Sequence, residues 1–218
     1  MRKDAYIDGV MARMNELGWD DSLSGMFLGG DTSKVERHIA LTYVDAWRRS
    51  VGMFPLSYYH HASFLGGRHE YDKSVGTGYV VVPSDYYGLS EFRMRGWRRS
   101  CYAAIDENNN VLSVQSNEYV RGNYVRPVCT LGIHPLYGKV INYYSIPKGD
   151  EHVVTRAMYV PLVKSLESLS NADDIIKELR ATVLLVEPLM WVHTGIVFSE
   201  FEKFDAAKIA FDMAKLII

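Results

Sequence analysis

The sequence predicts an α+β fold: a helical bundle built from both termini, with an inserted antiparallel β-sheet domain. Helical periodicity of apolar residues occurs near both ends of the 218-residue chain, whereas short β-prone runs separated by turns fill the middle. Strand-like runs do not alternate regularly with helical ones, which disfavours a parallel sheet of β–α–β units. We therefore expect N-terminal bundle helices over 1–56, the β insertion over 57–160, and C-terminal bundle helices with a docking arm over 161–218.

Two helices are predicted in the N-terminal part. Apolar residues from Ile7 to Leu17 fall at helical spacing, and Gly18 is placed to end that helix. The sequence from Ser33 to Glu36 has the pattern of a capping box, in which side chains at both ends of the first turn satisfy backbone N–H groups. The helix that it opens is expected to run to about Val51.

Short runs of β-branched and aromatic residues indicate the strands of the middle part. Turn-forming residues separate these runs at hairpin spacing, which predicts antiparallel pairing. The expected strands are Gly78 to Val82, Phe92 to Trp97, Arg99 to Ile105, Val111 to Gln115, Tyr124 to Leu131, Lys139 to Tyr144 and Val153 to Val160.

Helical periodicity returns at Asn171, where Asn171 or Ser170 can cap a helix, and Pro188 is expected to end or kink that helix. A weaker helical piece follows over 189–198, and the run from Ser199 to Glu202 resembles a second capping box. The last helix carries Phe201, Phe204 and Phe211 on one predicted stripe, and the sequence closes on the apolar residues Leu216, Ile217 and Ile218.

The composition is that of an ordinary globular protein and limits the classes of function. A formal net charge of −2 disfavours a protein whose main task is to bind nucleic-acid phosphates. The two cysteines, Cys101 and Cys129, lie in apolar strand-like sequence and are predicted to be reduced core residues, which favours folding inside a cell. The N-terminal segment lacks a secretory apolar region, and no apolar run approaches the roughly 18 residues that span a bilayer, so we expect no membrane association.

The search for chemical motifs predicts a protein without catalytic residues, metal or cofactor. The pattern of a serine nucleophile elbow and that of a dinucleotide-binding loop are both missing from the sequence. His60, His61 and His69, with Glu70 and Asp72 nearby, are the one group with metal-ligand residue types, but their spacing matches no zinc pattern. A polar loop is the simpler interpretation of this group.

Arginines in the middle of the chain are the more informative group. In a strand, Arg93 and Arg95 share one face while Phe92 and Met94 share the opposite one, which is the alternation of a half-buried sheet. Arg126 follows further along the chain. This basic face could contact an acidic surface of a neighbouring subunit, nucleic acid or water, and the sequence leaves these three alternatives open.

Short motifs along the whole chain carry a resemblance to a known family. They are Ala46-Trp47-Arg48-Arg49 leading to Pro55, Val82-Pro83-Ser84-Asp85-Tyr86-Tyr87, Trp97 before a strand, Ser116-Asn117-Glu118-Tyr119, Asn123-Tyr124-Val125-Arg126-Pro127-Val128, Tyr143-Tyr144, and Met158-Tyr159-Val160-Pro161. In this order they resemble a tailed-bacteriophage head-to-tail connector of the adaptor or ring type, most of all those of crAss-like phages.

The resemblance implies a mechanical function in the virion. Twelve copies would form a ring below the portal protein, continue the DNA channel and bind a downstream tail ring or other tail proteins, while double-stranded DNA passes without sequence-specific binding. The protein would reside in the tail or neck of the virion, and in the host cytoplasm during assembly. The residues expected at subunit interfaces are Arg93, Arg95, Arg126, Phe201, Phe204, Phe211, Leu216, Ile217 and Ile218.

Two other classes of function stay open. A sugar- or receptor-binding virion module would use the aromatic residues, which include 15 tyrosines, as an exposed stacking platform. A virion-associated enzyme would require a cleft that gathers several ionisable groups.

Overall fold

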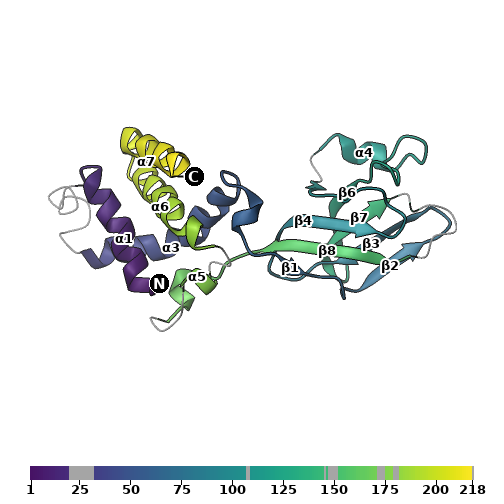
Figure 1. Ribbon diagram of the computed structural model, residues 1–218, viewed down its shortest axis with the longest axis horizontal. Coiled ribbons are helices and arrows are strands. Elements are labelled where there is room, and N and C mark those ends of the chain that lie inside the picture. Colours follow the sequence, from purple (N-terminus) through teal and green to yellow (C-terminus); the bar gives the residue numbers. More distant parts are fainter. Residues whose placement is uncertain are drawn as a thin grey trace. The chain divides into compact units, whose positions relative to one another are not determined.

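The computed structural model describes residues 1–19, 32–106, 109–144, 146, 152–170, 175–178 and 182–217 (Figure 1). The chain divides into two compact units. Unit 1 contains Met1–His60 and Val163–Ile218, and unit 2 contains His61–Leu162. Each unit is described by itself below.

Unit 1 is helical. The long helices come from both ends of the chain and pack against one another, with α6 in contact with α1, α3 and α7. The elements of unit 1 are α1 (Lys3–Glu16), α3 (Thr32–Val51), the 3₁₀ turn η1 (Leu56–Tyr58), η2 (Leu166–Ser168), α5 (Ile175–Glu178), η3 (Val183–Leu185), α6 (Val186–Glu200) and α7 (Phe204–Leu216).

Helix α6 is the central helix of unit 1, because its own residues are buried on all of its sides. Val183–Glu200 is long and apolar enough to cross a membrane by length and composition, but most of this segment is buried, as in the core helix of a globular protein. Helix α7 packs on α6 closely through alanines. Gly195 permits this approach, because a Cβ atom there would lie 2.7 Å from the Phe211 ring.

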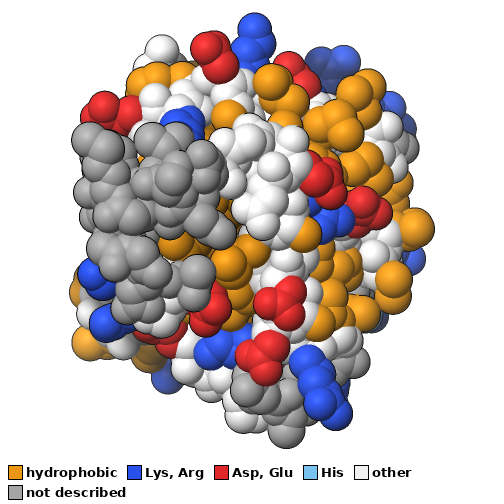
Figure 2. All heavy atoms as spheres, turned by 90° about the vertical axis from the view of Figure 1, so that its left-hand side faces the viewer, with side chains coloured by type: hydrophobic (Ala, Val, Ile, Leu, Met, Phe, Trp, Pro, Cys, Tyr) orange, Lys and Arg blue, Asp and Glu red, His pale blue; other side chains and the backbone are white. Residues whose placement is uncertain are grey.

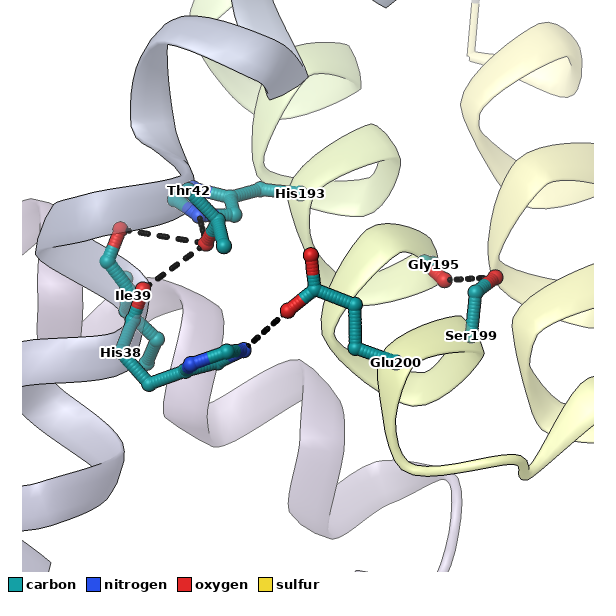
Figure 3. Close-up of polar contacts among 7 residues, drawn as sticks. All are labelled: His38, Ile39, Thr42, His193, Gly195, Ser199 and Glu200. Atoms are coloured by element: carbon teal, nitrogen blue, oxygen red, sulfur yellow. Dashed lines mark hydrogen bonds and ion pairs between the residues drawn. The ribbon is translucent and has the colours of Figure 1, made fainter.

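Two sequence predictions near α6 are wrong. Pro188 does not end a helix but stands in the first turn of α6, where a missing N–H group costs no helical hydrogen bond. Ser199 and Glu202 do not open the last helix: α6 continues to Glu200, and the Ser199 hydroxyl donates to the carbonyl oxygen of Gly195 at 2.8 Å (Figure 3). The predicted cap at Asn171 lies outside the described residues.

Unit 2 contains strands of up to nine residues and one short helix. Strand β4 is the longest of them, and a hairpin joins β6 to β7. The elements are β1 (Ala62–Ser63), β2 (His69–Asp72), β3 (Thr77–Val81), β4 (Tyr86–Met94), β5 (Ala104–Ile105), α4 (Val111–Gln115), β6 (Cys129–His134), β7 (Gly138–Tyr144) and β8 (Val154–Pro161).

The predicted fold, a terminal helical bundle around one antiparallel sheet, is wrong. The strands form two sheets, a three-stranded one in the order β1-β8-β4 and a five-stranded one in the order β2-β3-β7-β6-β5. The second sheet is mixed, because β5 pairs parallel with β6. The parallel pair was not expected because Val111–Gln115, which was predicted to be a strand, is helix α4. The connection through α4 brings the chain back in the same direction, as a parallel pair requires.

The core of unit 2 contains side chains from both sheets. Phe92 of β4 stacks on Tyr143 of β7, with ring centroids 5.7 Å apart, and Val80 and Ile141 are buried in the same cluster. Cys101 and Cys129 are buried and free, which confirms the prediction of reduced core cysteines. The predicted turn over 147–150 lies outside the described residues.

Candidate functional site

The arginine face predicted from the sequence lies at the end of strand β4. Phe92 and Met94 are fully buried, whereas Arg93 is half-buried and Arg95 is exposed. The predicted alternation is therefore confirmed over this segment. It follows from the pleat of the strand, which sends successive side chains to opposite faces and leaves the arginines on the outer one.

A second strand adds a basic residue that the sequence did not single out. Arg93 of β4 lies directly opposite Arg156 of β8 in the antiparallel register. Like charges in such a pair repel each other. Together they border an open pocket of about 330 Å³, called the arginine pocket here, which is lined by Arg93, Met94, Arg95, Gly96, Trp97, Thr155 and Arg156.

Polar contacts hold the two opposed guanidinium groups in place. Arg93 Nη2 donates to the carbonyl oxygen of Trp97 at 3.1 Å, and Arg156 Nη1 donates to Glu91 Oε2 at 2.9 Å. The hydroxyl of Ser100 donates to the other carboxylate oxygen of Glu91 at 2.7 Å. This hydrogen bond, followed by Arg156, holds the pKa of Glu91 below its usual value.

The arginine pocket has the chemistry of a site that binds oxyanions such as carboxylates. A guanidinium group carries five N–H donors in a planar fork that matches the two oxygens of a carboxylate. Three of the residues that line the pocket are arginines, and Glu91, which is not one of the lining residues, pairs with Arg156. An acidic side chain of a partner fits this arrangement.

Arg126, the third predicted interface arginine, is not part of the pocket lining. It is exposed and stands in a turn before β6, where its backbone N–H donates to Asn123 Oδ1 at 3.0 Å. The sequence placed Arg126 in a strand, but β6 begins only at Cys129.

The predicted C-terminal interface residues occupy different surroundings. Phe201 caps the end of α6 and packs edge-on against His38, with ring centroids 5.3 Å apart. Phe211 lies beneath the guanidinium group of Arg49, 4.2 Å from the ring centroid. Phe204 and Leu216 are 67% and 78% exposed.

The three phenylalanines therefore do not form one stripe, because Phe201 precedes α7, whereas Phe204 and Phe211 lie seven residues apart on the same side of that helix. Ala207, Ala210 and Ala214 are the buried residues of α7. Ile217 follows α7 and is 41% exposed, whereas Ile218 lies outside the described residues. In the view of unit 1 in Figure 2, exposed hydrophobic side chains stand among acidic and basic ones.

The histidines singled out from the sequence do not assemble as a group. His69 of β2 instead packs against His152, with ring centroids 4.9 Å apart, and Tyr71 stacks on the other side of His152 at 4.4 Å. Burial and then the charge of His69 lower the pKa of His152 to about 4. Within the described part of the chain, no three His, Cys, Asp or Glu side chains gather as metal ligands would. The expected absence of a metal stays a prediction.

A buried histidine network lies in unit 1 between α3 and α6 (Figure 3). The Thr42 hydroxyl donates its one hydrogen to the His38 carbonyl oxygen at 2.9 Å, so Thr42 Oγ1 accepts from His193 Nε2, also at 2.9 Å. His193 Nδ1 is then the acceptor for the Tyr6 hydroxyl at 3.1 Å. Each hydrogen in this set has an acceptor, which assigns the network to stability rather than to chemistry.

Two comparisons, one with models of protein families and one with curated proteins, found no match to this chain. The resemblance to phage connector proteins therefore stays a hypothesis.

Proposed function

We propose that this protein is a virion structural subunit that forms a ring below the portal, connects phage head to tail and continues the DNA channel. The order of motifs along the whole chain supports this proposal. The observation that carries it is that both compact units expose large apolar side chains. They are Leu41, Val183, Leu184, Phe204 and Leu216 in unit 1, and Tyr102, Tyr119, Ile133 and Leu136 in unit 2.

Exposed apolar side chains in two separate units suit a ring subunit. In a head-to-tail ring each subunit meets its two neighbours through two different surfaces, so one chain needs two complementary patches. Large apolar side chains at such sites mark interaction surfaces, since burial by a partner removes them from water. In this proposal the arginine face with Arg93 and Arg95, together with Arg126, meets an acidic surface of the next copy.

The end of helix α7 is the proposed contact with the portal protein. Leu216 and Ile217 are exposed and apolar, whereas the alanine face of the same helix packs within unit 1. This arrangement would present the last turn to a partner without disturbing the helix core. A net charge of −2 also suits a conduit, because strong attraction to phosphates would slow the passage of DNA.

Electron microscopy of the pure protein tests the proposal. Negative-stain images of the concentrated wild type are expected to show closed rings with a central opening, and mass photometry is expected to give the mass of about twelve copies, as the resemblance implies. Particles that keep the mass of a single chain at every concentration, in the presence and absence of high salt, would contradict it.

A further inference from the structure

A hollow on the outer face of the five-stranded sheet is separate from the arginine pocket. Its volume is about 530 Å³, within the range of small-molecule sites. It is called the tyrosine hollow here, and the side chains that matter to the argument are Glu70, Asp72, Thr77, Tyr79, Asn142 and Tyr144.

The register of three strands puts these side chains on one face. Tyr79 of β3 lies opposite Glu70 of β2 and opposite Asn142 of β7. Thr77 lies opposite Asp72 and Tyr144 in the same way. The residues that alternate with them face the core of unit 2 instead, so the hollow occupies the side of the sheet that the core does not use.

Hydrogen bonds below the hollow fix two of its side chains. The hydroxyls of Tyr144 and the fully buried Thr130 lie 3.0 Å apart, and Asn142 Nδ2 donates to Thr130 Oγ1 at 3.4 Å. The Asn142 amide rests over Gly132, where a Cβ atom would lie 2.5 Å from its nitrogen. The amide and one phenol are therefore held in position without a ligand.

Tyr79 supplies a second oriented ring and a hydroxyl group beside Glu70. Its ring packs against His134, with centroids 4.9 Å apart, and Tyr137 stacks on the far side of His134 at 4.7 Å. The Tyr79 hydroxyl lies next to the Glu70 side chain. Burial, followed by a hydrogen bond to the Glu70 side chain, raises the pKa of Tyr79 to about 12, so the phenol keeps its proton at neutral pH.

We propose that the tyrosine hollow binds a neutral saccharide. Sugars present C–H groups that pack on aromatic rings and hydroxyls that pair with amides, phenols and carboxylates, which are the groups gathered here. The lining contains two carboxylates, Glu70 and Asp72, and one cation, Lys73, and Glu70 also pairs with Arg68 at 3.5 Å, so the hollow has no excess of positive charge to attract a phosphate. The proposal is independent of ring formation, which involves other residues.

Saturation-transfer NMR on the full-length protein tests this site. The probes are glucose, galactose, mannose and N-acetylglucosamine with their common disaccharides, and inorganic phosphate serves as the anionic comparison. For at least one sugar, we expect transfer of magnetisation from the protein to the ring protons. The transfer should level off as the concentration of that sugar is raised. Transfer to none of these sugars, or stronger binding of phosphate at the same residues, would overturn the proposal.

Two substitutions locate the binding. Tyr79→Phe removes one oxygen and keeps the ring, and Asn142→Ala removes the oriented amide; each is expected to weaken sugar binding roughly tenfold, as loss of one hydrogen bond does. Tyr87→Phe is the matched control, because Tyr87 belongs to β4 of the other sheet and is 37% exposed. If Asn142→Ala unfolds the protein, Tyr79→Phe alone decides. Equal weakening in the Tyr87 variant, or unchanged binding in the Tyr79 variant, contradicts the assignment.

Discussion

Two polar regions of the molecule, the histidine network of unit 1 and the outer face of the five-stranded sheet of unit 2, differ in burial. In unit 1, His193 is completely buried and both of its ring nitrogens have partners, Tyr6 and Thr42. In unit 2, Glu70 on the outer face of the five-stranded sheet is exposed, and Tyr79 and Asn142 beside it are half-buried. Unit 2 also places Arg93 opposite Arg156, a pair that repels.

This difference separates polar residues that the protein encloses from polar residues that a ligand or partner can reach. A buried donor that lacks an acceptor costs free energy, whereas a completed network makes the fold specific and leaves nothing for a ligand to pair with. We therefore assign stability to the histidine network of unit 1 and recognition to the two polar surfaces of unit 2. The predictions below test this contrast.

The largest effect is expected from His193→Ala. The substitution leaves a cavity between α1, α3 and α6 and deprives the buried Tyr6 hydroxyl of its acceptor, so the free energy of unfolding should fall by about 3 kcal/mol. Urea unfolding followed by tryptophan fluorescence measures this change. Glu200→Gln is the control, because Glu200 pairs with His38 at 2.5 Å but is 45% exposed, and the expected loss is under about 1 kcal/mol. Equal losses in both variants would contradict the contrast.

A pH dependence is expected from the same histidine. Burial, followed by the charge of His38, lowers the pKa of His193 from 6.5 to about 3. Between these two pKa values the unfolded chain binds a proton at His193 and the folded protein does not. The contribution of His193 to the free energy of unfolding is therefore fully present above pH 6.5 and is lost as the pH falls toward 3. The slope should reach roughly 1.4 kcal/mol per pH unit for this one group.

Urea unfolding of the wild type and of His193→Gln at a series of pH values isolates this contribution. The variant has no titrating ring at this position and should lose less stability between pH 6 and about 4 than the wild type does. Parallel pH profiles of the two proteins would show that His193 does not carry the acid sensitivity.

The double variant Arg93→Glu with Arg95→Glu is expected to separate assembly from folding. A glutamate at position 93 would face Arg156 and replace a repulsive pair by an attractive one, so unit 2 should keep its stability within about 0.5 kcal/mol. Ring formation measured by mass photometry should be lost, because the basic face is reversed. Arg48→Glu on the exposed surface of α3 is the control for charge reversal elsewhere. Rings that persist in the double variant would show that this face is not an interface.

The smallest effect on stability is expected from Leu216→Glu. The side chain is 78% exposed, so the free energy of unfolding should change by less than about 0.5 kcal/mol. If the proposed connector function is correct, docking to a portal protein, measured by co-sedimentation, should nevertheless weaken. Ala214→Glu is the contrasting variant, because Ala214 is completely buried and its replacement should destabilise unit 1 itself. Normal docking by the Leu216 variant would contradict a role for this turn.

Local sequence patterns determined several features of this protein. Apolar spacing from Ile7 to Leu17 predicted the helix that the structure shows as α1, and strand alternation predicted which side Phe92 and Arg93 would face. The same alternation in Lys139 to Tyr144 could have separated Asn142 and Tyr144 from the core residues between them, although the sequence alone did not indicate a hollow there. Such features depend on the period of one element, and a single segment of sequence contains that period.

Only the tertiary structure decided which strands meet and which polar residues are left over. The two sheets, the parallel pairing of β5 with β6 and the opposition of Arg93 to Arg156 depend on contacts between segments far apart in the chain. Pro188 begins α6 rather than ending a helix, because packing selected the helix that follows it. The complete burial of His193 and the partial exposure of Tyr79 have the same physical cause. Whether a donor finds an acceptor depends on side chains that the fold brings from other elements, and no local pattern contains that information.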